Sequence, residues 1–280
     1  MDKDVKINLF DNDFRHIDFS VHGKKSSLME WVRDQHQWDG VTVFTNEVMF
    51  SKAVDEVNSN KKVGWLSEPR SIKPWIYEHI PKVEDKFDYI ITHDKKLLAS
   101  DPFSKYRFAP VGGCWIAEEN YKIFPKDKLV STIVSPKKHT DGHRLRHVIA
   151  DKYRREIDVF GKEYDPIETK EEGLTQYQFS VVVENSSVKG YFTEKLLDCF
   201  AVGTIPIYWG CRNIEDFFDP AGILRFDSPQ QFNTIMSSLD NSLYNKLLPY
   251  AKKNFQLFRQ YELTEDWIYE NILKDEMART

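Results

Sequence analysis

The sequence predicts an α/β protein built from two Rossmann-like, doubly wound domains and a helical C-terminal tail. Short β-branched runs alternate with helical patterns, and this alternation occurs twice along the chain. The 280 residues are near twice the usual length of a single domain. Hydrophobic residues at 41% and charged residues at 30% are typical of a folded globular protein.

The first half of the chain carries the first round of this alternation, which we assign to a domain over residues 1–120. In an open α/β sheet, ligands bind beyond the carboxyl ends of the strands, so the loops after the strands are the places to look for chemistry. The expected strands lie at 6–10, 41–46, 62–66 and 87–94, and the expected helices near 48–57 and 74–80.

The second half repeats the pattern, and we assign it to a domain over residues 128–262. A loop over residues 117–128 marks the boundary between the domains. Residues 230–277 have mostly helical patterns, and a last helix over residues 263–280 is a candidate for packing back toward the first domain. The expected strands lie at 129–135, 157–161, 177–183, 204–210 and 222–227, and helices lie near 144–155 and from 194 onward.

Composition and spacing argue against several classes of protein. With a net charge of −5 the chain lacks a dominant basic face, so we expect no nucleic-acid partner. Cys114, Cys199 and Cys211 form no C-x-x-C pair, which predicts neither a disulfide framework nor a zinc site and favours a reducing compartment. No run of about 18 apolar residues occurs, so we expect no membrane span or signal peptide, and a cytoplasmic location.

The most informative segment runs from the buried strand 181–183 into the next helix. The strand ends at Glu184, so the polar groups that follow emerge at the carboxyl edge of the sheet. Thr193 is the expected N-cap. The helix dipole opposes a lysine in the first turn, and an anionic ligand beside Lys195 would explain that residue. The apolar face of the helix is expected to hold Leu196, Leu197, Phe200 and Ala201, and its polar face Glu194, Lys195, Asp198 and Cys199.

This segment resembles the signature of the family 10 fucosyltransferases in order and spacing. That signature is a strand ending in E-N-S, then Y-x-T-E-K, then an A/I-x-P-I/V strand, and the chain has Glu184-Asn185-Ser186, then residues 191–195, then residues 204–210. The resemblance is strongest over residues 129–227. It implies a GT-B fold, with two Rossmann-like domains facing a cleft, that uses GDP-fucose as donor substrate and needs no cofactor.

The same resemblance implies a role for each matching residue. Lys195 would contact the donor diphosphate, Glu194 the ribose hydroxyls, and Asn185 and Tyr191 the nucleotide or the sugar, with Glu184 in the same donor-binding element. The alternative is a capped core helix whose glutamate and lysine are solvated.

A basic helix precedes this element, and such a run by itself is usually a solvated helix face. The family carries a phosphate-binding arginine on this helix, upstream of a D-V-F-G strand. Counting back from residues 158–161 places Arg146 at that position, with Arg144 as the neighbouring alternative. A guanidinium group presents paired donors that match phosphate oxygens, so a metal ion is not required. The triplet Asp11-Asn12-Asp13 is expected to serve turn and cap chemistry, and no metal site is expected.

Inverting transfer from a nucleotide sugar needs a base that takes a proton from the acceptor hydroxyl. Glu68 follows the strand 62–66 and precedes Pro69. It resembles the E-S-P element that carries the proposed base of the family, although the serine between glutamate and proline is missing. The alternative is an exposed glutamate paired with Arg70.

Other residues at strand ends and three tryptophans stay open as candidates. His93 and Asp94 directly follow the apolar run 87–92 and form the reserve for the base. Trp65, Trp75 and Trp115 are candidates for stacking on sugar rings, although a core position is commoner for tryptophan.

The function predicted from the sequence is transfer of fucose from GDP-fucose to a hydroxyl of a glycan acceptor, with inversion. Two alternatives remain: the same fold with GDP-mannose or a UDP-sugar as donor, and a non-catalytic nucleotide- or glycan-binding module. The acceptor, the linkage and the oligomeric state are left open by the sequence.

Overall fold

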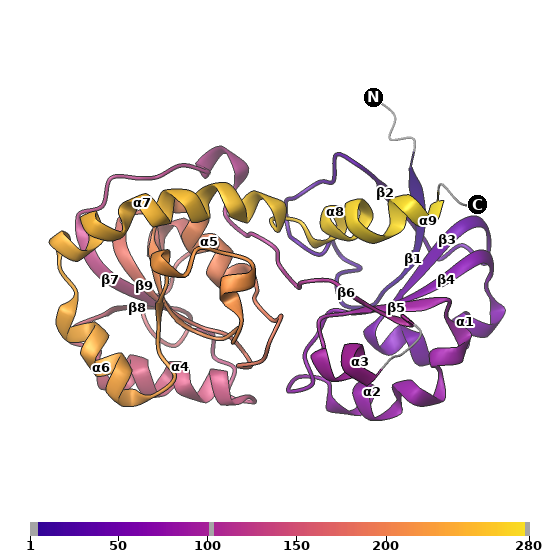
Figure 1. The fold of residues 1–280 in the computed structure, drawn as a ribbon, viewed down its shortest axis with the longest axis horizontal. Helices are drawn as coiled ribbons and strands as arrows, with labels where there is room; N and C mark the ends of the chain where they lie inside the picture. Colours follow the sequence, from indigo (N-terminus) through magenta and orange to yellow (C-terminus); the bar gives the residue numbers. More distant parts are fainter. Residues whose placement is uncertain (1–4, 101–103, 278–280) are drawn as a thin grey trace. The chain divides into compact units, whose positions relative to one another are not determined.

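The computed structural model describes residues 5–100 and 104–277 and divides the chain into two compact units. The first unit is formed by residues 1–111 together with 263–280, and the second by residues 112–262. The C-terminal segment, yellow in Figure 1, therefore belongs with the indigo N-terminal part of the chain. The stretch 117–128, which the sequence marks as a boundary, lies inside the second unit.

The first unit contains a six-stranded sheet in the order β2-β1-β3-β4-β5-β6, in which all neighbours pair in parallel. Parallel strands joined through helices form the predicted α/β arrangement. The two short edge strands, β2 and β6, were absent from the sequence-based prediction. The strands are β1 (Lys6–Phe10), β2 (Glu30–Arg33), β3 (Gln37–Thr45), β4 (Asn58–Leu66), β5 (Tyr89–Thr92) and β6 (Tyr106–Phe108).

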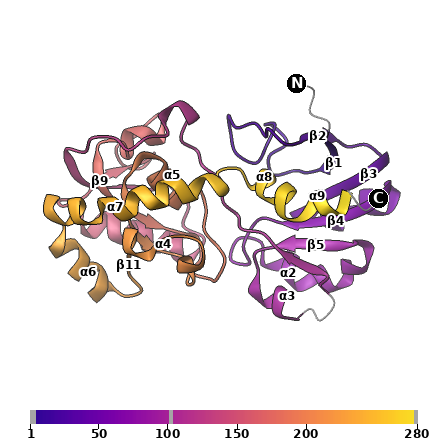
Figure 2. The same ribbon diagram turned by 45° about the horizontal axis from the view of Figure 1, so that its top comes forward.

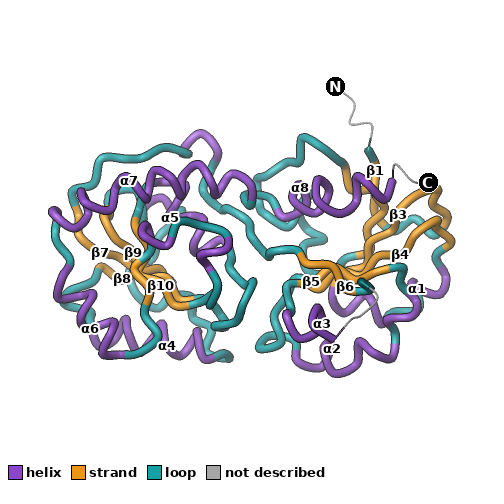
Figure 3. Tube along the Cα trace, viewed as in Figure 1, coloured by secondary structure: helices purple, strands orange, loops and turns teal. Residues whose placement is uncertain are grey.

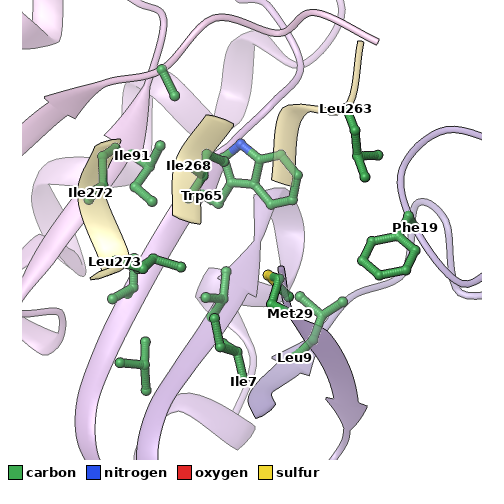
Figure 4. Packing of buried hydrophobic residues seen from close by; sticks show 14 of the residues in the cluster. Ile7, Leu9, Phe19, Met29, Trp65, Ile91, Leu263, Ile268, Ile272 and Leu273 are labelled. Carbon is green, nitrogen blue, oxygen red and sulfur yellow. The ribbon is translucent and has the colours of Figure 1, made fainter. Parts of the chain in front are cut away.

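Both faces of this sheet are covered, because successive side chains of a strand point to opposite faces. On one face, Leu66 and Ile90 pack against η1 (Asn46–Phe50), α1 (Ala53–Glu56), α2 (Pro74–His79) and α3 (Lys95–Ser100). On the other face, Trp65 and Ile91 pack against the C-terminal segment α8 (Thr264–Ile268), η9 (Tyr269–Leu273) and α9 (Lys274–Met277) (Figure 4). The single helix predicted near 48–57 is thus two short ones, separated at Ser51, which is extended.

The second unit contains a five-stranded parallel sheet in the order β11-β10-β9-β7-β8. The strand order reverses between β7 and β9, and ligands of open α/β sheets bind at the carboxyl ends of the strands at such a point. Every residue of β9 is buried. The strands are β7 (Lys128–Ile133), β8 (Asp158–Phe160), β9 (Tyr177–Val183), β10 (Ile205–Trp209) and β11 (Leu224–Arg225).

Helices cover both faces of the second sheet, which lies between them in Figure 3. On one face lies α5 (Glu194–Val202), and on the other lie α4 (Asp141–Lys152) and α6 (Pro229–Ser238). The long helix α7 (Asn241–Leu257) lies beside α5, as Figures 1 and 2 show from two sides. The predicted class, two doubly wound α/β units with a helical C-terminal part, is confirmed.

Two further features bear on the predictions from composition. Within residues 5–100 and 104–277, no helix is both long and apolar enough to cross a membrane. The three cysteines are buried and carry free thiols.

Candidate functional site

A pocket of about 290 Å³ opens in the second unit where β7 and β9 end. This is the point at which the strand order of the sheet reverses. Four cationic side chains, Lys137, Arg146, Lys170 and Lys195, line the pocket with two carboxylates, Glu194 and Asp198. The pocket therefore suits an anionic ligand. The other lining residues are Trp115, Ile133, Ser135, His143, Leu174, Ser180, Val181, Val182, Val183, Asn185 and Cys199.

Helix α4 brings Arg146 into the pocket. The helix starts at the N-cap Thr140 and its first turn packs against the end of β9, where only glycine fits: a Cβ atom at Gly142 would lie 1.7 Å from the carbonyl oxygen of Glu184. The Nε of Arg146 donates to the carbonyl oxygen of Val183 and one Nη donates to Oδ1 of Asn185, both at 2.7 Å. Burial lowers the pKa of this guanidinium, which nevertheless stays charged.

Arg144, the alternative to Arg146, lies outside the pocket. Its side chain is exposed and binds Asp141 at 2.5 Å on its own helix. The predicted arginine at position 146 is therefore the one that the fold directs into the pocket.

Helix α5 brings Glu194 and Lys195 into the same pocket. Thr193 is the N-cap, as predicted, and its hydroxyl accepts from the backbone N–H of Lys195. The ammonium of Lys195 donates to Oε1 of Glu194 at 2.8 Å and lies 3.9 Å from Oε2 of Glu184. The charge of Lys195 is thus partly balanced inside the protein, which the sequence-based interpretation did not anticipate.

Glu184 supports the start of α5 and does not line the pocket. It is fully buried, and its two carboxylate oxygens accept from the backbone N–H and the hydroxyl of Thr193, at 2.9 and 2.7 Å. Burial raises its pKa. Tyr191 is also buried, and its hydroxyl lies 3.4 Å from Nδ2 of Asn185. Asn185 lines the pocket, whereas Glu184 and Tyr191 lie behind the lining residues.

A second lysine, which the sequence did not reveal, holds Glu194 from the other side. Lys170 comes from the short 3-10 turn Lys170–Gly173, and its Nζ lies 2.6 Å from Oδ2 of Asp198 and 3.8 Å from Oε1 of Glu194. Burial alone would raise the pKa of Glu194, but Lys195 and Lys170 lower it well below its usual range. Glu194 is therefore a carboxylate in this pocket, able to accept hydrogen bonds from hydroxyl groups.

Asp198 corrects the sequence-based view of α5, which placed it on a polar face with Cys199. Both residues are buried. Asp198 is tolerated there because Oδ1 accepts the backbone N–H of Trp115 at 2.7 Å and Oδ2 binds Lys170. The ring of Trp115 lies 4.9 Å from the Lys170 ammonium and is half exposed in the pocket.

Replacing Lys170 by methionine is expected to lower the free energy of unfolding by about 2–3 kcal/mol, because Asp198 is then a buried carboxylate without its cation. The side chain of Lys170 is about a quarter exposed, so the loss falls below that of a fully buried pair. Urea unfolding measures the change. The double variant Lys170→Met/Asp198→Asn keeps an acceptor for Trp115 and should recover at least half of the loss. A single variant as stable as the parent would contradict the pairing.

In the first unit, Glu68 follows β4 at the carboxyl edge of the sheet, and contacts on both sides hold its backbone. Its N–H lies 3.4 Å from Oδ1 of Asn46, and its carbonyl oxygen accepts from the hydroxyl of Tyr77 at 2.5 Å. The Arg70 guanidinium, the alternative partner of Glu68, binds both carboxylate oxygens of Asp94, at 2.6 and 3.0 Å.

The two reserve candidates for the base have structural roles. Asp94 accepts from the backbone N–H of Lys96 and Leu97, and although burial opposes it, the Arg70 hydrogen bond lowers the pKa of Asp94. His93 is buried, and burial lowers its pKa to about 4. A carboxylate held by arginine is a weak base, and a buried imidazole has little access to an acceptor.

The turn interpretation of the Asp11–Asp13 triplet is confirmed. Asp11 accepts from the backbone N–H groups of Asp13 and Phe14, at 3.1 and 2.9 Å.

Among the tryptophans, Trp65 is a core residue of the first unit and Trp75 is exposed beside Phe50. Only Trp115 of these three lines the pocket.

Comparison with known proteins agrees with this geometry. The family model described as glycosyltransferase family 10 (fucosyltransferase) C-term matches residues 123–272. An α-(1,3)-fucosyltransferase FucT of Helicobacter pylori is 35% identical over 96 residues, which are 34% of this chain and 19% of that protein. An α-(1,4)-fucosyltransferase of Arabidopsis thaliana is 33% identical over 69 residues, which are 24% and 17% of the two chains. The matches thus span less than a fifth of these relatives.

Solved structures extend the likeness to the whole fold. A crystal structure of an α1,3-fucosyltransferase superposes with a TM-score of 0.55 at 16% identity, over 96% of this chain and 90% of that chain. One with GDP-fucose gives 0.54 at 15% identity, over 96% and 91%. Two parallel-sheet units with a cationic pocket at the end of the second sheet have the architecture of the GT-B fold class. Because the family model covers more than half of the sequence, the chain belongs to glycosyltransferase family 10, the fucosyltransferase family.

Proposed function

We propose that the chain transfers fucose from GDP-fucose to a hydroxyl group of a glycan acceptor, with inversion at the anomeric carbon and without a metal ion. The observation that carries the proposal is that Arg146 of α4 and Lys195 of α5 line one pocket at the point where the strand order reverses. The relatives that match the chain are named as fucosyltransferases, and a solved structure of the same fold is titled as holding GDP-fucose.

The two cations would stabilise the departing diphosphate. At a separation of about 4 Å and an effective dielectric constant of about 20, one unit charge attracts another by roughly 4 kcal/mol before the cost of desolvation. Preorganised cations of this kind assist departure of the leaving group most when negative charge develops on it. Glu194, ionised between Lys170 and Lys195, would accept hydrogen bonds from the ribose hydroxyls. Asn185 would orient the nucleotide or the sugar, and Glu184 and Tyr191 would support these contacts from behind.

Glu68 would supply the base of a single-displacement reaction. A carboxylate that takes the proton of the acceptor hydroxyl as it attacks the anomeric carbon is the general base that inversion requires. The fixed backbone of Glu68 at the edge of the first sheet supports this role. The three buried free thiols fit a reducing compartment, and we propose the cytoplasm as the place of action.

Guanosine compounds are expected to raise the melting temperature selectively in a thermal-shift panel of GDP, UDP, ADP, CMP and the corresponding nucleotide sugars. A ligand at about 100 times its dissociation constant stabilises the folded state by roughly 2.7 kcal/mol. Selective stabilisation by UDP would mean that the donor is a UDP-sugar and not GDP-fucose. Stabilisation by GDP without donor turnover or hydrolysis would identify a binding module. No shift with any guanosine compound would contradict the donor assignment.

Inversion is tested separately, by NMR analysis of the anomeric configuration of the product.

A further inference from the structure

His143 lies in the same pocket as Arg146 and Lys195, and neither the family signature nor the proposed mechanism uses it. It occupies the third position of α4, one turn before Arg146, and is buried. The inference drawn from this residue rests on the proposed function, because it concerns the same diphosphate.

The contacts of Thr140 determine which ring nitrogen of His143 carries the proton. The backbone N–H of Thr140 points at Nδ1 of His143 at 3.3 Å, and the Thr140 hydroxyl lies 2.9 Å from the same atom. In return the backbone N–H of His143 donates to the Thr140 hydroxyl at 3.1 Å. This is a capping box in which histidine takes the place of the usual glutamate or glutamine. A backbone N–H can only donate, so Nδ1 is an acceptor and the neutral ring is protonated at Nε2.

The charges around His143 keep the ring neutral. Arg146 faces it from the same helix, Lys195 from α5, and Lys137 and His139 from the loop after β7. Burial, together with the positive charges of Arg146, Lys137 and Lys195, lowers the pKa of His143 to about 4, so the ring is uncharged near pH 7. The ring is then a hydrogen-bond donor through Nε2, which has no partner among the residues that the structure describes.

Ser135 adds a second polar group on this side of the pocket. It follows β7 and lines the pocket, and its buried Oγ has no hydrogen-bond partner within the described part of the chain. Buried hydroxyl groups are normally paired, so an unpaired one in a cationic pocket is consistent with a ligand at that position. Donors and cations therefore surround a space that an anion with several oxygens fits.

We propose that neutral His143 donates a hydrogen bond from Nε2 to a phosphoryl oxygen of the bound nucleotide diphosphate, as a third contact beside Arg146 and Lys195. A neutral donor would hold the phosphate without adding a further charge to a pocket that already contains four cations. The ring would also fix the position of the diphosphate along α4, because Thr140 holds the ring of His143 through Nδ1.

Two substitutions at position 143 separate hydrogen-bond donation from helix capping. Both glutamine and glutamate restore the usual capping box with Thr140, so both variants keep the acceptor for its backbone N–H. The amide of glutamine also offers a neutral N–H donor, whereas glutamate places a second acceptor and a negative charge there. His139→Gln, which changes an exposed histidine of the preceding loop, is the matched control.

Isothermal titration at pH 7.5 with GDP, and with inorganic pyrophosphate as a probe independent of the base, measures the effect. His143→Gln should lose no more than about 3-fold in affinity for both probes, and His143→Glu should lose at least about 10-fold more than His143→Gln. Wild-type affinity in His143→Glu, or equal losses in both variants, would overturn the role of His143. If the unchanged protein binds neither probe, the diphosphate pocket itself is refuted. If it binds pyrophosphate but not GDP, only the guanine assignment fails, and the pyrophosphate titrations still decide the role of His143.

Discussion

Replacing Glu68 by glutamine is expected to lower the rate of fucosyl transfer by about 10²–10⁴-fold, the usual contribution of a general base. Glutamine has nearly the same shape, and the backbone of position 68 would keep its contacts with Asn46 and Tyr77, so the loop should keep its conformation. The affinity for GDP should stay the same, because the pocket proposed to hold the nucleotide belongs to the second unit. Initial rates with GDP-fucose and a panel of glycan acceptors, together with GDP titration, measure the two effects.

Glu78→Gln is the matched control for this prediction. Glu78 is an exposed glutamate on α2 of the same unit, so its variant removes the same charge without touching the candidate base. The control should transfer at the parental rate. Transfer by Glu68→Gln at the rate of the Glu78→Gln control would remove Glu68 from the mechanism, and a parallel loss of GDP affinity would indicate a folding defect.

Replacing Arg146 by methionine is expected to lower the affinity for GDP by about 100-fold, the effect of truncating one partner of a buried, hydrogen-bonded charge pair. Arg146 as a residue is only 6% exposed, so its interaction with a phosphate would be little screened by water. The variant should also lose about 1–3 kcal/mol in stability, since the carbonyl oxygen of Val183 and the amide of Asn185 lose a donor. Calorimetric titration and urea unfolding measure these two losses separately.

The control for Arg146 lies two residues earlier on the same helix. Arg144→Met removes an exposed arginine that binds Asp141 and the carbonyl oxygen of His139 and does not line the pocket, so its GDP affinity should stay within about 2-fold of the parent. Similar losses in both variants would mean that the net charge of α4, and not a specific contact of Arg146, attracts the nucleotide.

The parts of the second unit that the sequence predicted are those with a strong local signal. The continuous apolar run of β9 followed by Glu184 marked a buried strand and its carboxyl edge, and Thr193 marked the start of α5. These two signals lie within one element and its immediate neighbours, where periodicity and capping operate. Arg146 was identified through the resemblance to the family 10 fucosyltransferases, which implies a phosphate-binding arginine on the helix before the D-V-F-G strand.

The residues that the sequence missed depend on contacts between distant segments. Lys170 lies on an irregular connection with no periodicity, and it pairs with Asp198 28 residues later. Asp198 was assigned to a solvated face because helical spacing alone does not show that a lysine and the Trp115 backbone cover that face. The partner of Arg70 was missed for the same reason, since Asp94 lies 24 residues away.

In the first unit, the central strands were predicted because their apolar runs are long and bounded by polar residues. The edge strands β2 and β6 are short and only partly buried, so they carry too weak a pattern to be recognised. The C-terminal segment packs on the first sheet through four apolar residues that belong to the same buried cluster as the strands: Leu263, Ile268, Ile272 and Leu273.

A crystal structure of the protein with GDP tests most directly whether a cationic pocket in the second unit holds the nucleotide. We expect the diphosphate oxygens in the pocket at the ends of β7 and β9, within about 3 Å of the guanidinium of Arg146 and the ammonium of Lys195. GDP bound elsewhere on the chain, or in this pocket with its diphosphate turned away from both cations, would contradict the proposal.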